Sequence, residues 1–95
     1  MLVTAALLVA PIAAADTYPR LEVELGKTVT VDVGQRRGLI CDDTSIITPD
    51  LSTRNGRNYF VVTGNTLGAT LCRVGTEPGQ ISVFYEVHVV PPKRH

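Results

Sequence analysis

Residues 58–74, NYFVVTGNTLGATLCRV, constrain the fold of this chain more than any other stretch. They predict two short strands, at residues 59–63 and 69–74: every residue of the first is β-branched or aromatic, and Thr70 and Val74 of the second are β-branched. The connection between them holds Gly64 and Gly68, where a reversal of the chain needs positive φ or a close backbone approach. Alternate residues of each strand then face opposite sides of a sheet.

The composition indicates one small β-domain. The 95 residues leave room for a single domain; 44% of them are hydrophobic, although only 5% are aromatic and tryptophan is absent. Because aromatic residues are so few, the hydrophobic core must consist mainly of Val, Ile and Leu, and this composition favours β-structure. Nine basic residues balance nine acidic ones, so we expect neither a nucleic-acid partner nor binding to an anionic membrane.

The N-terminal segment is expected to be an export signal. Residues 2–15 carry no charge; this length suits the apolar part of a signal peptide and falls short of the roughly 20 apolar residues that a membrane-spanning helix needs. Three alanines precede Asp16 and supply a cleavage site. We therefore expect a signal peptide at 1–15, a β-domain at 16–92 and a charged tail at 93–95. The mature protein would be periplasmic or secreted, without a membrane span.

Export makes a disulfide the expected state of Cys41 and Cys72, the two cysteines of the chain. A closed loop of about 30 residues stabilises a fold by roughly 3.5 kcal/mol in the chain-entropy model. We expect the bond to join the two sheets of a sandwich, between their packed faces. His88 and His95 add too few ligands for a zinc pattern, so the sequence predicts no metal and no cofactor.

Alternating apolar and polar residues predict the other strands. We expect them at residues 21–25, 28–33, 39–41 and 81–90. At Gly26 the first of these either kinks or changes sheets. We expect a turn at Pro49-Asp50 and a polar loop at residues 52–58, in which Asn55-Gly56 forms a type I′ turn. The whole pattern predicts an all-β fold: a small antiparallel, immunoglobulin-like β-sandwich of six to seven short strands with one disulfide.

The strand at residues 81–90 is the longest that the pattern predicts. Its odd-numbered residues, from Ile81 to Val89, are expected to face the core, and Phe84 and His88 to face the other way. If this strand lay at a sheet edge, its unpaired N–H and C=O groups could accept a strand from a partner.

The residue pattern does not support catalysis. Asp42 and Asp43 are adjacent, so in an extended segment their carboxylates point to opposite faces, and the Asp-Ser composition around them is typical of a turn. The sequence has no Gly-x-Ser-x-Gly elbow, and both cysteines are expected to be oxidised. We therefore predict a non-enzymatic protein with no catalytic residue.

Three segments resemble the N-terminal domain of bacterial pilus-assembly secretins. Residues 21–28 (LEVELGKT) are similar to its L-x-L-x-x-G-x-S/T opening, residues 40–46 (ICDDTSI) to its V-A-D-P-x-I segment, and residues 61–71 (VVTGNTLGATL) to its V-x-G-x-x-x-G-x-T-x-L segment. The chain departs from the family pattern at one point, where Asp42-Asp43 replaces the Asp-Pro of the family. The Cys41 and Cys72 pair is not part of the resemblance. The resemblance implies a stand-alone exported module that binds a secretin or another pilus or secretion component.

A small secreted inhibitor or ligand-binding β-sandwich is the alternative. Chagasin-like inhibitors of cysteine proteases are similar in size and class to this chain. Their Asn-Pro-Thr-Thr-Gly loop is absent, because residues 65–68 (NTLG) lack the proline and occur at a different place.

Overall fold

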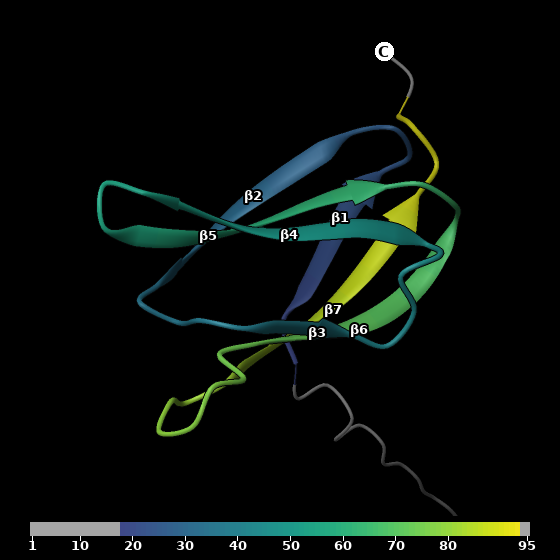
Figure 1. Ribbon diagram of the computed structural model, residues 1–95. Coiled ribbons are helices and arrows are strands. Elements are labelled where there is room, and N and C mark those ends of the chain that lie inside the picture. The colour runs from purple at the N-terminus through teal and green to yellow at the C-terminus, as the bar shows by residue number, and fades with distance from the viewer. Residues whose placement is uncertain (1–17, 94–95) are drawn as a thin grey trace, which may run out of the picture.

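The computed structural model describes residues 18–93, which form two packed β-sheets (Figure 1). The strands are β1 (Arg20–Glu24), β2 (Thr28–Gly34), β3 (Leu39–Cys41), β4 (Ile47–Arg54), β5 (Arg57–Gly64), β6 (Gly68–Val74) and β7 (Val83–Val90). The expected signal peptide at residues 1–15 lies outside the described residues, and so do the last two residues of the expected tail.

The two sheets have the strand orders β1-β7-β6-β3 and β2-β5-β4. Neighbouring strands are antiparallel except β1 and β7, which run parallel. The strands β3-β6-β7 and β2-β5-β4 correspond to the C-F-G and B-E-D sets of the immunoglobulin fold, with β1 placed beside the last strand. The predicted all-β sandwich is confirmed, with seven strands.

The chain changes sheets at Gly26, one of the two alternatives that the sequence leaves open. The N–H of Leu25 donates to the carbonyl of Val90 in the first sheet, at 2.9 Å. The next N–H, that of Gly26, donates to the carbonyl of Gly64 in the second sheet, also at 2.9 Å. Gly26 has φ +82°, a conformation that costs glycine little and other residues more.

Gly64 lies where β5 passes closest to β1. A Cβ atom on Gly64 would lie 2.8 Å from Cγ1 of Val89 and 3.2 Å from the carbonyl oxygen of Glu24. Its φ is not positive, so the requirement for glycine here comes from the close approach of two backbones. Gly68, at the start of β6, has φ +149°.

Replacing Gly64 with alanine is expected to lower the free energy of unfolding by about 1–3 kcal/mol, because the new methyl group overpacks the junction of the sheets. Urea denaturation of the purified protein measures the change. Val89→Ala removes the side-chain atom nearest to the new methyl group. The double variant Gly64→Ala/Val89→Ala should therefore lose less free energy of unfolding than the two single variants lose in total. A Gly64→Ala protein with wild-type stability would contradict this account of the junction.

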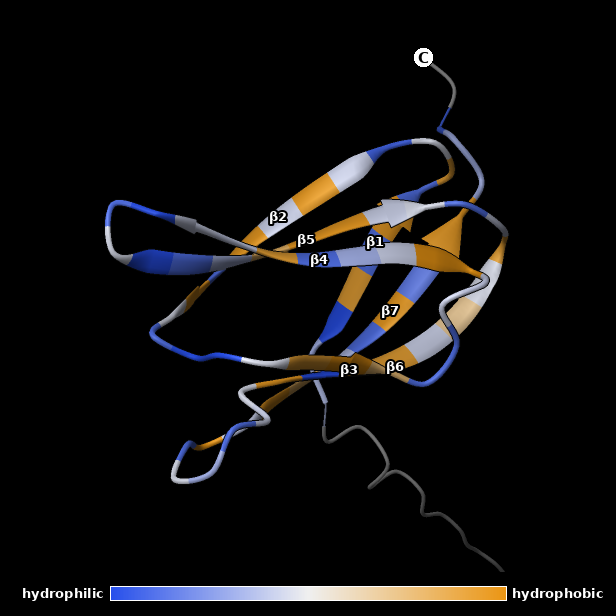
Figure 2. Cartoon of the chain, in the orientation of Figure 1, coloured by the Kyte–Doolittle hydropathy of each residue, from blue (hydrophilic) through white to orange (hydrophobic). Residues whose placement is uncertain are grey.

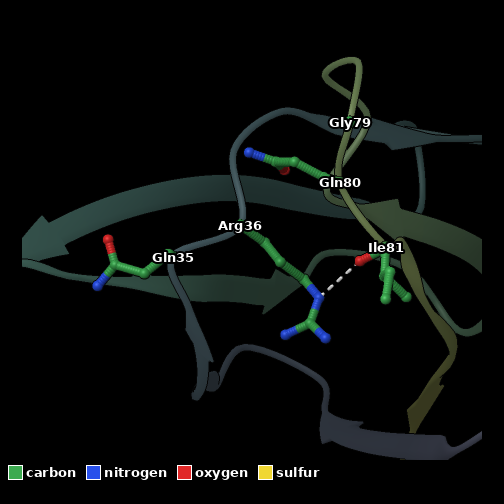
Figure 3. A pocket seen from close by; sticks show the side chains of 5 residues that line it. All are labelled: Gln35, Arg36, Gly79, Gln80 and Ile81. Carbon is green, nitrogen blue, oxygen red and sulfur yellow. Dashed lines mark hydrogen bonds between the residues drawn. The ribbon is translucent and has the colours of Figure 1, made fainter.

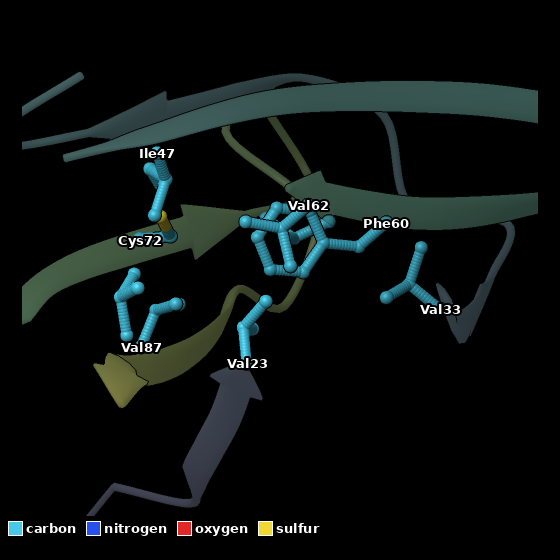
Figure 4. Packing of buried hydrophobic residues seen from close by; sticks show 9 residues of the cluster. Val23, Val33, Ile47, Phe60, Val62, Cys72 and Val87 are labelled. Atoms are coloured by element: carbon cyan, nitrogen blue, oxygen red, sulfur yellow. The ribbon is translucent and has the colours of Figure 1, made fainter. Parts of the chain in front are cut away.

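The core consists of aliphatic side chains around one phenylalanine ring (Figure 4). The buried hydrophobic residues are Val23, Val33, Ile47, Phe60, Val62, Cys72, Val74, Val87 and Val89. Both sheets contribute them at alternate positions, which Figure 2 shows as hydrophobic bands separated by paler or hydrophilic ones. The ring of Phe60 in β5 stacks on that of Tyr85 in β7, with centroids 5.6 Å apart, and so joins the two sheets at their centre.

The strands β4 and β5 correct two expectations. Pro49-Asp50 and residues 52–54 belong to β4, and residues 57–58 belong to β5, rather than to turn and loop. The N–H of Asn65 donates to the carbonyl of Ile46, and in an antiparallel pair such bonds recur at every second residue. The backbone nitrogen of Pro49 therefore faces the free edge of the sheet, where a missing N–H costs no hydrogen bond. The predicted type I′ turn is confirmed, since Asn55 and Gly56 have φ 54° and 80°.

The strand β7 is shorter than predicted and lies inside its sheet. Ile81 precedes it, is 81% exposed and does not face the core, because the chain is still in the β6–β7 connection at this point. Val87 and Val89 are buried, as the alternation predicts. The strand is paired with β1 on one side and β6 on the other, so it does not have the edge position that strand addition at residues 81–90 requires.

Candidate functional site

The Cys41–Cys72 disulfide is formed, but within one sheet and not between two as the sequence analysis predicts. The two residues are directly opposite each other in the register of β3 and β6, with their Cα atoms 4.0 Å apart. Both side chains pack on the core, and Cys72 is fully buried. Because β3 is an edge strand of only three residues, the bond fastens the weakest strand of this sheet to its neighbour.

A row of exposed and half-buried side chains crosses the outer face of the four-stranded sheet. Ile40, Arg73 and Phe84 are register partners on β3, β6 and β7. The ring of Tyr18 lies against that of Phe84, with centroids 5.0 Å apart, and the guanidinium carbon of Arg73 lies 5.8 Å from the Phe84 centroid. Tyr18 is 44% exposed and Ile40 is 58% exposed. We call these four residues the Phe84 row.

The Phe84 row has the composition of a protein–protein interface. Tyrosine, phenylalanine and arginine are enriched at such interfaces, and tyrosine and arginine are frequent among the residues that carry most of the binding energy. The chain has only three tyrosines and two phenylalanines, and it places two of these five rings, Tyr18 and Phe84, in a pair on the outside of the sheet. The alternation of β7 predicts that Phe84 faces outward; its three companions follow only from the strand order.

Arg73 is the cation of the Phe84 row, and it pairs with no carboxylate within residues 18–93. Its Nε donates to the hydroxyl oxygen of Ser82 at 3.0 Å. On the same face Arg20 pairs with Glu22 at 3.1 Å, Nε2 of His88 lies 3.0 Å from the Glu86 carboxylate, and Glu24 accepts a hydrogen bond from the backbone N–H of Lys93 at 3.4 Å. A carboxylate brought by a partner could therefore bind Arg73 without displacing an ion pair of this chain.

The connection at residues 35–38 ties together the loops at one end of the sandwich. Nε of Arg36 donates to the carbonyl of Ile81 at 2.9 Å (Figure 3), and a second guanidinium N–H donates to a carbonyl of β2 at 3.2 Å. The side-chain amide of Gln35 donates through Nε2 to the carbonyl of Gly56 at 2.7 Å. An open depression of about 360 Å³ lies here, lined in part by Gln35, Arg36 and Ile81. Since Arg36 already binds two carbonyls, its main role is to join the loops.

The Asp42-Asp43 pair lies in the connection after β3, where both residues are exposed. The backbone N–H and the hydroxyl of Ser45 both donate to the Asp43 carboxylate, and these bonds lower the pKa of Asp43. This is the geometry of a turn. Within residues 18–93 there is no group of three or more His, Cys, Asp or Glu side chains that could hold a metal ion.

Comparison with protein-family models and with curated protein sequences finds no match.

In the part of the chain that the structure describes, no helix is long and apolar enough to cross a membrane.

Solved structures with a similar fold come from a surface-layer protein. A structure of domains 4 and 5 of the S-layer protein SbsC covers 93% of this chain with a TM-score of 0.55 and 19% sequence identity. A structure of SbsC domains 1–6 covers 95% of it with a TM-score of 0.56 and 18% identity. This chain spans 56% of the first structure and 14% of the second. The likeness shows a shared fold: a β-sandwich module.

Proposed function

We propose that this chain is an exported, non-enzymatic module that binds a protein partner through the Phe84 row. The observation that carries the proposal is the pair formed by the exposed ring of Tyr18 and the half-buried ring of Phe84, with Arg73 over the Phe84 ring and Ile40 beside Arg73. Export is supported by the disulfide, since such bonds persist mainly outside the cytosol. The disulfide also keeps β3, and with it Ile40, in place beside the other members of the row.

The chemistry of the Phe84 row defines what its partner must carry. Covering Tyr18, Phe84 and Ile40 removes apolar surface from water, so the partner needs an apolar strip of matching length. Arg73 would be desolvated at the centre of the contact and needs an acceptor there. A carboxylate of Asp or Glu suits it best, because a guanidinium binds a carboxylate through two parallel hydrogen bonds.

We propose that this partner belongs to the pilus-assembly or secretion machinery, as the resemblance to secretin N-terminal domains implies. The three resembling segments lie apart in the sequence but are hydrogen-bonded to one another in the fold. The Gly26 N–H binds the carbonyl of Gly64, and the Asn65 N–H binds the carbonyl of Ile46, both within 2.9 Å. The resemblance thus falls on one connected end of the sandwich rather than on scattered strands.

Partner capture tests both proposals. Tagged mature protein, mixed with envelope extract from its own source, should retain a partner that Phe84→Ser or Arg73→Glu reduces roughly tenfold or more. Tyr59→Ser and Arg54→Glu are matched controls, because Arg54 lies 5.3 Å over the Tyr59 ring on the other sheet. The controls should leave capture unchanged.

Capture that survives both changes in the Phe84 row would contradict the proposed surface. Equal losses in the row variants and in their matched controls would also contradict it. Identification of the captured partner by mass spectrometry decides the second proposal separately: a protein outside pilus assembly and secretion would overturn that assignment and leave the surface intact.

A further inference from the structure

The free edges of the two sheets differ in how they are protected against pairing with another strand. At β1 the backbone groups that point away from β7 belong to Arg20, Glu22 and Glu24, and charged residues discourage strand addition. The edge strand β3 has only three residues. On β4, Pro49 faces the free edge. Three of the four edges are therefore protected.

The strand β2 lacks these protections. It has seven residues, none of them proline or lysine, and within residues 18–93 it pairs only with β5. The N–H of Gly64 donates to the carbonyl of Lys27, and antiparallel bonds recur at every second residue, so Val29 and Val31 pair with β5. The register then shifts between Asp32 and Gly34, which leaves Val33 without a partner in β5. The backbone N–H and C=O groups that point to the free edge are those of Thr28, Thr30 and Asp32.

The side chains at this edge also favour an added strand. Val29 and Val31 face the core but remain half-exposed, whereas Val33 is only 2% exposed. A further strand alongside β2 would cover both half-exposed valines. The one charge in the strand, on Asp32, is balanced by Arg57, whose Nε lies 2.9 Å from the carboxylate and lowers the pKa of Asp32. Asp32 is one charged residue among the three at this edge, whereas all three residues at the edge of β1 are charged.

We propose that two copies of this chain pair through the free edges of β2, antiparallel, so that their three-stranded sheets join into one sheet of six strands. A two-fold axis at Thr30 places the two Thr30 residues opposite each other, and each Thr28 opposite the second copy's Asp32. On the inner face each Val29 then meets the second copy's Val31. Every edge group finds a partner of matching chemistry, and no like charges are opposed.

A second copy fits this edge better than an unrelated segment because β2 is complementary to itself. In a single register, the Thr30 hydroxyl groups of the two copies lie opposite each other, each Thr28 hydroxyl lies opposite an Asp32 carboxylate, and each Val29 lies opposite a Val31. The inference goes beyond the proposed function, since the edge of β2 lies in the other sheet from the Phe84 row. The contact is smaller than a standard interface, so we expect a dissociation constant of roughly 10 μM to 1 mM.

Sedimentation equilibrium from about 1 μM to about 1 mM protein tests the proposal and should show a monomer–dimer transition. Thr30 is solvent-facing, so Thr30→Lys and Thr30→Glu should both fold, which circular dichroism checks. Each change places like charges opposite each other at the two-fold axis and should raise the dissociation constant roughly tenfold or more. An equimolar mixture of the two variants should restore the dimer. Thr66→Lys, at an exposed threonine of the β5–β6 connection, is the matched control and should leave dimerisation unchanged.

A protein that stays monomeric over the whole range overturns the proposal. So does a dimer that Thr30→Lys leaves intact, or a mixture of the two charged variants that fails to dimerise. Phe84→Ser should dimerise like the wild type, so a failure of the Phe84 row to capture its partner is distinguishable from a failure of β2 pairing.

Discussion

Reduction of the Cys41–Cys72 disulfide is expected to lower the free energy of unfolding by about 2–5 kcal/mol. The bond joins residues 31 apart in sequence, so its loss frees a long loop in the unfolded chain. A domain of this size has a total stability of only about 4–11 kcal/mol. The reduced protein should therefore be close to unfolding at physiological temperature.

Urea denaturation of oxidised and reduced protein measures this difference. The double change Cys41→Ala and Cys72→Ala should cost more than reduction alone, because alanine leaves a small cavity at the fully buried Cys72. Hydrogen exchange gives a local readout: the amides of β3 should lose protection well before those of β5 when the bond is reduced. Identical urea midpoints for the two redox states would show that the bond adds nothing to the fold.

Phe60→Ala is expected to cost about 3–5 kcal/mol, the largest effect of any single core substitution in this chain. Phe60 is the largest fully buried side chain, and its ring bridges the sheets by stacking on Tyr85. The surrounding valines are too short to fill the space that the ring would leave. Urea or thermal denaturation should therefore find the variant unfolded or barely folded.

Two control variants separate the cavity from other effects of changing Phe60. Phe60→Leu keeps most of the buried volume and should lose clearly less stability than alanine. Tyr59→Ala alters the neighbouring ring, which faces outward, and should change stability by less than about 1 kcal/mol. A comparable loss in Tyr59→Ala and Phe60→Ala would mean that the sheets are not held together through Phe60.

The features that the sequence predicts well are those that depend on residues close together in the chain. The alternation in β2 and β6 identifies their buried faces, because a strand that covers a core on one side must alternate. Asn55-Gly56 identifies a hairpin turn because both residues tolerate positive φ. The pairing of Cys41 with Cys72 follows from their number and from the expectation that the chain is exported.

The features that the sequence does not predict depend on which strands become neighbours. Pro49 reads as a turn signal, and only the edge position of β4 makes it compatible with a strand. The sequence predicts the disulfide between two sheets, whereas β3 and β6 are neighbours in one sheet. The Phe84 row forms only when three strands pair in the right register and the segment before β1 lies beside them. Tyr18 and Phe84 are far apart in the sequence, so the sequence alone does not show that their rings are in contact.

The parallel arrangement of β1 and β7 has a mechanical consequence. Because the two strands run in the same direction, the described chain enters beside one end of the sandwich and leaves from the other (Figure 1). Tension on the two ends would shear all the β1–β7 hydrogen bonds at once, which resists separation better than breaking them one after another. If these bonds did rupture, the Cys41–Cys72 bond would still hold residues 41–72 in a closed loop and withhold roughly 100 Å of chain from extension. The pairing of β1 with β7 thus makes the fold resistant to a pull applied to the two ends of the described chain.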